Sequence, residues 1–355
     1  MLEMFLQWYR RRFSDPHVVA LFISLIIGFC IIFIFNDILT PLLVAIVLAY
    51  LLEWPTQKIC QLGFSRLTAA SIVLVIFMGI SAMVFLIIVP LVWQQGMNLL
   101  FDLPSMVNSF NEYAKSLPKR YPALVDAGII DMIVNNLRSR LSVFGESLLK
   151  YSVASLISII SIAIYLVLVP LIIFFLLKDK TRMIYGLQRI LPRNQLLVNQ
   201  VWQEMNQQIT NYIRGKVIEM IIVGICTYMA FTFLSLRYSL FLAVLVGVSV
   251  LLPYIGAVVV TIPVVLVALF QWGIGSDFWT LFIVYFIIQG LDGNLLVPIL
   301  FSEVVNVHPL VIILSVIVFG GLWGFWGVFF AIPLATLIKA IMHVFPEDIF
   351  ITKIG

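Results

Sequence analysis

The 355 residues are 63% hydrophobic and only 11% charged, with a formal net charge of +4 and a mean hydropathy of +1.13. A soluble domain carries roughly a quarter charged residues, so this composition excludes a water-soluble fold. Long continuous apolar runs also exclude an outer-membrane barrel, whose strands alternate in polarity. The sequence therefore predicts an all-α, polytopic helical membrane protein with no nucleic-acid partner.

The N-terminus places the basic triplet Arg10–Arg12 before the first apolar run, as a signal peptide would. No small-residue cleavage site follows Phe35, and a second apolar run begins at once. We therefore interpret this run as an uncleaved first span. In chain order the sequence predicts eight apolar segments, at about 18–35, 39–52, 70–92, 152–177, 217–236, 240–271, 278–301 and 308–339.

Loop charge predicts the orientation of these segments. The connection 178–216 holds seven basic and two acidic residues, whereas the polar stretch 94–150 holds six basic and five acidic ones. Basic loops stay in the cytoplasm. We therefore expect a protein of the bacterial inner membrane, with 94–150 outside the cytoplasm and both termini in the cytoplasm. The number of segments between these loops gives the same assignment.

Two polar stretches carry helical periodicity. In 94–150, apolar residues recur at three- and four-residue steps from Leu103 to Leu117, beside Pro104, and again from Ile130 to Leu148. This stretch is predicted to be a helical extracytoplasmic insert whose apolar face packs on itself, on the membrane or on another subunit. A second amphipathic helix is predicted from about Leu196 to Arg214, either lying under the bilayer or serving as a gating element.

The sixth and eighth segments are longer than one span needs and are interrupted, by Pro253-Tyr254-Ile255-Gly256 and by GGLWGFWG (Gly320 to Gly327). Each is predicted to be a kinked helix or a re-entrant pair. Non-helical backbone at membrane depth must face protein or water, and transporters use such breaks around their substrates. For the glycine-rich run, close helix packing through the Gly320 and Gly324 pair is a second interpretation.

Asp292 is an acid inside an apolar segment, where a charge costs about 2.5–3.5 kcal/mol. One interpretation is an ion or proton site, with amide partners at Gln289 and Asn294. The other is that the helix ends at Leu291 and Asp292 lies in a re-entrant turn. Glu53 and Glu219, at the ends of other apolar runs, are predicted to lie at the membrane interface, and His308 to cap the last segment.

The sequence lacks the catalytic and cofactor-binding motifs that would indicate an enzyme. The sequence has no GxxxxGK[ST] loop, no HExxH and no GxSxG motif. Its three histidines are far apart, and its three cysteines have neither metal spacing nor the pattern of a disulfide framework. We predict no enzyme activity, no cofactor, no metal and no catalytic residue.

Four blocks of the chain are recognisable together: PLLVAIVLAYLLEWP (Pro41 to Pro55), YIRGKVIEMIIVGI (Tyr212 to Ile225), SVLLPYIGAVVVTIP (Ser249 to Pro263) and the stretch from Leu291 to Ala340. They resemble the autoinducer-2 exporter family. The first sixteen residues and LKDK (Leu177 to Lys180) are similar to one permease branch of that family. The resemblance implies about eight helical segments, an extracytoplasmic insert after the third, homo-oligomeric assembly and efflux of small solutes.

These observations predict five regions: 1–93 with the first three segments, the insert 94–150, the fourth segment 151–177, the cytoplasmic linker 178–216 and a transport core 217–355. The predicted function is export of a small polar solute, which the resemblance implies to be of the autoinducer-2 type. A sodium–proton antiporter and a non-transporting membrane scaffold are the alternatives. Membrane lipid, a small molecule or ion, and further copies of the chain are the expected partners. The substrate or ion pathway is predicted to involve Asp292, Gln289, Asn294, Tyr254, Gly256 and Gly320.

Overall fold

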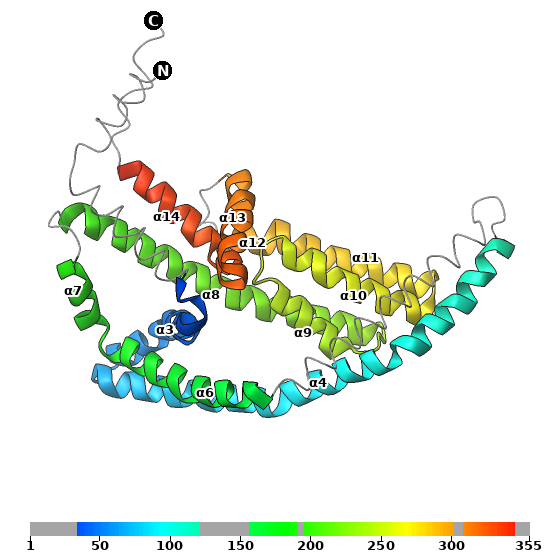
Figure 1. The fold of residues 1–355 in the computed structure, drawn as a ribbon, viewed down its shortest axis with the longest axis horizontal. Helices are drawn as coiled ribbons and strands as arrows, with labels where there is room; N and C mark the ends of the chain where they lie inside the picture. The colour runs from blue at the N-terminus through cyan, green and yellow to red at the C-terminus, as the bar shows by residue number, and fades with distance from the viewer. Residues whose placement is uncertain (1–33, 121–155, 191–194, 302–307, 345–355) are drawn as a thin grey trace, which may run out of the picture. The chain divides into compact units, whose positions relative to one another are not determined.

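The computed structural model describes residues 34–120, 156–190, 195–301 and 308–344, and every regular element within these ranges is helical (Figure 1). In chain order the elements are α3 (Asn36–Gln61), α4 (Arg66–Arg120), α6 (Leu156–Lys178), α7 (Lys180–Ile190), α8 (Gln195–Phe233), α9 (Ser239–Ser249), α10 (Ile255–Trp272), α11 (Ser276–Leu291), the π-helix η1 (Asp292–Leu296), α12 (Val297–Phe301), α13 (Pro309–Phe329) and α14 (Ala331–Val344).

Six helical stretches in the described ranges are long and apolar enough to cross a membrane, which confirms the predicted class. They are Ile38–Gln61, Arg66–Met106, Met205–Phe233, Ile255–Trp272, Ser276–Phe301 and Pro309–Phe329. The first predicted segment, 18–35, lies outside the described residues. The second, expected to be short at 39–52, belongs to the 26-residue helix α3.

The chain divides into two compact units, each with its own contacts. Unit 1 comprises 1–77, 167–215 and 301–355, and unit 2 comprises 78–166 and 216–300. Both units are therefore built from segments that are far apart in the sequence. The five consecutive regions expected from hydropathy stay a prediction.

Two helices continue through positions where the sequence suggested a boundary. Helix α4 is one 55-residue helix that passes both residue 93 and Pro104, and its described residues between these points have no positive φ. At about 1.5 Å per residue it is about 82 Å long, far more than the roughly 30 Å hydrocarbon layer. The first part of the expected insert is thus a projection of the third span, and residues 121–150 lie outside the described ranges.

Helix α8 likewise joins the predicted amphipathic helix to the fifth apolar segment in one 39-residue helix. Gly215, the residue best suited to break it, is buried against the ring of Phe301, where an added Cβ would come within 2.6 Å of Cε1. The prediction of a separate helix ending near Arg214 is therefore wrong. Close packing at Gly215 keeps the backbone helical through a change of hydropathy.

The sixth segment is broken where the sequence predicted. Helix α9 ends at Ser249 and α10 begins at Ile255, and the two pack on each other within unit 2 (Figure 1). Pro253 lacks a backbone N–H and disfavours helix at the residue before it. Tyr254 has a φ of 59°, so the chain reverses here into a helical hairpin.

The eighth segment is also a broken pair, in unit 1. Gly324 has a φ of 58° and a ψ of −130° inside α13, and α14 follows after Phe330 and packs on α13. Gly320 and Gly327 allow the close approach after the reversal, because an added Cβ would collide with Val328 and with the Phe319 carbonyl respectively. Gly324 has open space around its Cα, so it is the hinge of this turn and not a packing glycine.

Candidate functional site

Asp292 lies inside a continuous helical stretch and not at a helix end. Helix α11 passes directly into η1, which begins at Asp292, and η1 passes into α12. The interpretation that the helix ends at Leu291 is therefore wrong. Single π-helical turns within α-helices are frequent at functional sites, and this one lies in the candidate span Ser276–Phe301.

The charged neighbours of Asp292 come from α8. Its carboxyl interacts with Lys216 and Glu219, all three within unit 2. The Nζ of Lys216 lies 2.9 Å from Oε2 of Glu219, and the two residues are only 5% and 2% exposed. We call Lys216, Glu219 and Asp292 the charged triad.

Lys216 also connects the triad to the break in the sixth segment. Its Nζ donates a hydrogen bond of 3.0 Å to the carbonyl oxygen of Val250, the first residue after α9. The break frees backbone carbonyls from helical bonding, and such groups need a partner at membrane depth. One ammonium group therefore forms an ion pair with a buried carboxylate and donates a hydrogen bond to the backbone of the α9–α10 hairpin.

The triad has the charge expected of a cation or proton site. One ammonium and two carboxylates leave a net charge of −1 when all three are ionised. A buried excess charge is costly, so binding of a proton or another cation would bring the cluster to neutrality. Within the described ranges no group of three or more His, Cys, Asp or Glu side chains is placed to hold a metal ion.

The other predicted pathway residues do not all gather around Asp292. Gln289 is half-buried on α11, and its backbone carbonyl accepts from the N–H of Asp292. Asn294 uses its amide nitrogen within its own helix, donating 2.8 Å to the carbonyl of Gly290. The electrostatic partners of the Asp292 carboxyl are thus charged residues of α8, where the sequence suggested amides.

Tyr254 and Gly256 both lie at the α9–α10 break. The Tyr254 side chain is 56% exposed, whereas Gly256 is buried. A Cβ on Gly256 would collide with the carbonyl oxygen of Ser249, so this glycine permits the close contact inside the hairpin. Gly320 belongs to unit 1, whereas the triad belongs to unit 2.

Lys216 was not predicted from the sequence, and Glu219 was predicted to lie at the membrane interface. Glu219 instead lies fourteen residues after Met205 and fourteen before Phe233, at the middle of that candidate span. The spacing of Lys216 and Glu219, three residues apart on a helix, is the signal that could have identified the pair. The placement of His308 is confirmed, since its Nδ1 accepts from the N–H of Leu310 at the start of α13.

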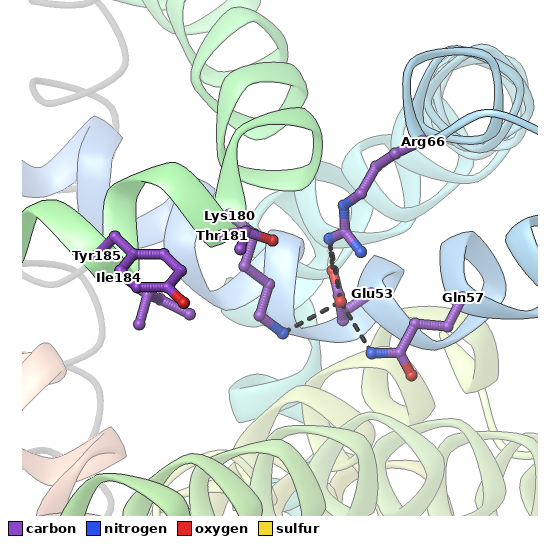
Figure 2. Close-up of a pocket in the computed structure, with 7 residues that line it drawn as sticks. All are labelled: Glu53, Gln57, Arg66, Lys180, Thr181, Ile184 and Tyr185. Atoms are coloured by element: carbon purple, nitrogen blue, oxygen red, sulfur yellow. Dashed lines mark hydrogen bonds and ion pairs between the residues drawn. The ribbon is translucent and has the colours of Figure 1, made fainter. Parts of the chain in front are cut away.

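A second buried acid, Glu53, lies in unit 1. Its carboxylate pairs with Arg66 at 2.8 Å and with Lys180 at 3.1 Å, and it accepts from Nε2 of Gln57 at 2.9 Å (Figure 2). Glu53 is only 6% exposed, and its position at the membrane interface stays a prediction. The pairing explains how the carboxylate is tolerated in an apolar helix.

Comparison with known proteins agrees with the membrane fold. Residues 21–347 match the AI-2E family transporter description. The chain is 64% identical to "Putative permease PerM" of Escherichia coli (strain K12), over 98% of both chains. It is 24% identical to "Putative transport protein YueF" of Bacillus subtilis (strain 168), over 91% of this chain and 88% of the relative. The match over almost the whole length, together with the helical spans, shows that this multi-pass membrane protein belongs to the AI-2E family of transporters.

Proposed function

We propose that the protein exports a small polar solute across the bacterial inner membrane and that a proton or another cation bound at the charged triad drives or controls the step. The observation that carries this proposal is a cluster of net charge −1 in the interior of two candidate spans, with Lys216 and Glu219 buried and Asp292 half-buried. Ionisable groups at this depth are rare and mark ion pathways and proton relays.

The hydrogen bond from Lys216 to Val250 gives the cluster a way to act on the backbone. Binding of a cation at Glu219 or Asp292 weakens the pull of these carboxylates on the ammonium. The ammonium of Lys216 is then attracted less strongly by Glu219, relative to its hydrogen bond with the carbonyl of Val250. The α9–α10 hairpin is therefore the element whose position we expect to depend on the charge of the triad.

Reconstitution of the purified protein in liposomes tests the proposal. Uptake or release of autoinducer-2-like and other small polar solutes is measured with and without a pH or sodium gradient. Asp292→Asn keeps the size of the side chain and removes its charge, so flux should lose its response to the gradient and its pH dependence should flatten. Asp277→Asn is the matched control, because Asp277 is an exposed acid in the first turn of the same helix.

If solute flux in Asp292→Asn responds to the gradient as in the wild type, the triad has no part in the mechanism. A passive transporter would then remain. Cation exchange without solute movement would instead indicate a sodium–proton antiporter. A protein that moves neither ion nor solute in any condition would be a membrane scaffold. The family and the buried charges favour solute transport over these alternatives and over catalysis.

We also propose cytoplasmic termini, an external 94–150 stretch and a homo-oligomer. Charge bias supports the orientation. The apolar face of the predicted insert and the glycine-rich last segment are the surfaces that we expect to lie between subunits. Native mass spectrometry in a mild detergent tests the assembly, and detection of monomer alone would reject it.

A further inference from the structure

The polar pocket around Glu53 is separate from the charged triad and has no role in the proposed coupling of cation binding to solute transport. It belongs to unit 1, has a volume of about 370 Å³, and is lined by Glu53, Gln57, Arg66, Lys180, Thr181, Ile184 and Tyr185 (Figure 2). This volume falls within the range of small-ligand sites, roughly 300–1,000 Å³. The pocket is therefore large enough for a phosphate-containing headgroup.

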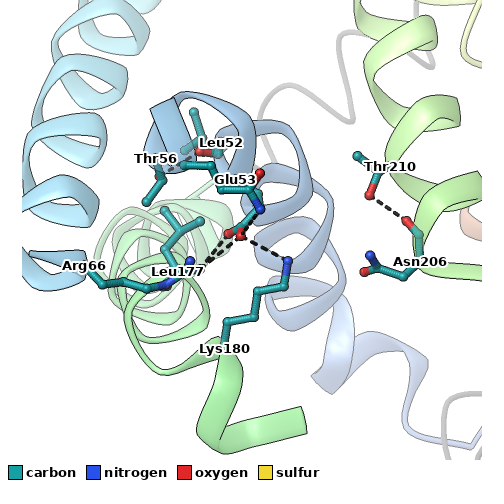
Figure 3. A network of polar contacts seen from close by, with 9 residues as sticks. Leu52, Glu53, Thr56, Arg66, Leu177, Lys180, Asn206 and Thr210 are labelled. Atoms are coloured by element: carbon teal, nitrogen blue, oxygen red, sulfur yellow. Dashed lines mark hydrogen bonds and ion pairs between the residues drawn. The ribbon is translucent and has the colours of Figure 1, made fainter. Parts of the chain in front are cut away.

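Positive charge exceeds negative charge around this pocket. Arg66 and Lys180 both pair with the single carboxylate of Glu53, and Arg214 of α8 also interacts electrostatically with it. Three cations thus surround one acid, which leaves two positive charges without a counter-charge from Glu53. Figure 3 shows Glu53 between Arg66 and Lys180, which approach it from α4 and α7.

Several donors remain for a ligand. Arg66 uses Nε for the carbonyl of Leu177 at 2.7 Å and Nη2 for Glu53, so its Nη1 has no partner among the described residues. Lys180 has three N–H groups and, among the residues that the structure describes, one ion pair, with Glu53. Thr181 and Tyr185, each with a hydroxyl group, also line the pocket. A planar guanidinium, an ammonium and two hydroxyls match the oxygen atoms of a phosphate group.

The pocket lies where apolar helices end. Arg66 is the first residue of α4, Lys180 is the first residue of α7, and α6 ends at Lys178. The turn before α4 exposes the apolar side chains of Leu62 and Phe64. A polar pocket beside the ends of membrane helices, next to exposed apolar residues, lies at the level of lipid headgroups, where basic sites bind anionic lipids.

We propose that this pocket binds the phosphate group of an anionic phospholipid, with Arg66 and Lys180 as its charged contacts. Free inorganic phosphate has the same recognition chemistry but no acyl chains. The lipid is the better ligand because the pocket opens beside the helix ends and apolar side chains. Bound lipid would hold the start of α7 against the end of α3.

Lipid retention measured by native mass spectrometry tests the proposal. The full-length protein is placed in nanodiscs of phosphatidylcholine with phosphatidylglycerol, released, and scored for bound lipid of each kind. Lys180→Gln should lower the preference for phosphatidylglycerol by about tenfold or more, the effect of losing one charge-assisted contact. Glu53 keeps its pairing with Arg66 in this variant, so the fold is retained.

Arg182→Gln is the matched control, since Arg182 is an exposed cation of α7 that does not line the pocket. It should retain the wild-type preference. Equal losses in both variants would indicate diffuse charge attraction and overturn the site. Thermal stabilisation of the protein by inorganic phosphate in phosphatidylcholine nanodiscs, with no preference for phosphatidylglycerol, would overturn the lipid assignment.

Discussion

Replacing Lys216 with methionine removes the ammonium group that bridges Glu219 and the carbonyl of Val250. The two paired residues are 5% and 2% exposed, so the remaining carboxylate has little access to water. Breaking a buried ion pair by removing one partner costs about 3–5 kcal/mol. The charge of the triad also changes from −1 to −2, so Lys216→Met should be strongly destabilising.

A double-mutant cycle with Glu219→Gln separates the ion pair from other effects. Glu219→Gln brings the triad to neutrality, and the double variant leaves Asp292 as its single charge. If the pair is coupled, the double variant should be more stable than the sum of the single effects by about 2–3 kcal/mol, equivalent to about 30- to 150-fold in the equilibrium constant. Reversible unfolding in mixed detergent micelles measures the free energy of unfolding for each variant.

The exposed pair Lys178 and Asp179 provides the control, with Nζ and Oδ2 3.9 Å apart and both side chains 35% exposed. Lys178→Met should change the free energy of unfolding by no more than about 1 kcal/mol. A coupling energy below about 0.5 kcal/mol between Lys216 and Glu219 would refute a buried, interacting pair. Asp292→Asn should cost little stability, because it removes the excess charge.

Three further predictions concern the breaks and the topology. Gly256→Ala should destabilise the protein by about 1–3 kcal/mol, because the added methyl group collides with the backbone carbonyl of Ser249. Gly293→Ala has open space for its methyl group and should not destabilise the protein. Thermal unfolding of both variants measures the difference. Tyr212→Phe should lower the free energy of unfolding by about 1–3 kcal/mol, because it removes the 2.7 Å hydrogen bond to the carbonyl of Phe329, the last residue of α13. Tyr228→Phe, at an exposed tyrosine of the same helix, serves as the control. Cysteine at Ser116 should react with an impermeant reagent outside intact cells, and cysteine at Asn194 should not; the reverse pattern would contradict the proposed orientation.

Local chemistry explains which parts of the fold could be predicted. Composition identifies a helical membrane protein because no other solvent accommodates so much apolar surface. Both broken segments were predictable, since Pro253 and the glycines near Gly324 restrict or free the backbone within a few residues. The ends of α4 and α8 were not, because a change in hydropathy at residue 93 or Arg214 does not itself end a helix.

The candidate site was predicted only in part. Asp292 was identifiable because a lone acid in an apolar segment is costly. Its interaction with Lys216 and Glu219 depends on the packing of α8 against a segment more than seventy residues later in the chain. Hydropathy does not show which residues far apart in the sequence lie close together in the fold. The sequence therefore suggested amides close to Asp292 in the chain as its partners. The burial of Gly256 was hidden for the same reason.

The bond between Lys216 and the carbonyl of Val250 leads to a final prediction about the α9–α10 break. An uncapped carbonyl inside the membrane requires water or another donor, so Lys216→Met should open the break. The backbone N–H groups of Ile255 and Gly256, which bond within the turn, should then exchange with deuterium faster. Glu219→Gln keeps the ammonium and frees it from a charged competitor, so it should leave exchange unchanged or slower. Hydrogen–deuterium exchange of peptides covering 250–258 distinguishes these outcomes. Faster exchange in both variants would mean that the ion pair as a whole holds the break, whereas no change in either would show that the turn holds itself and that the triad does not act through this hairpin.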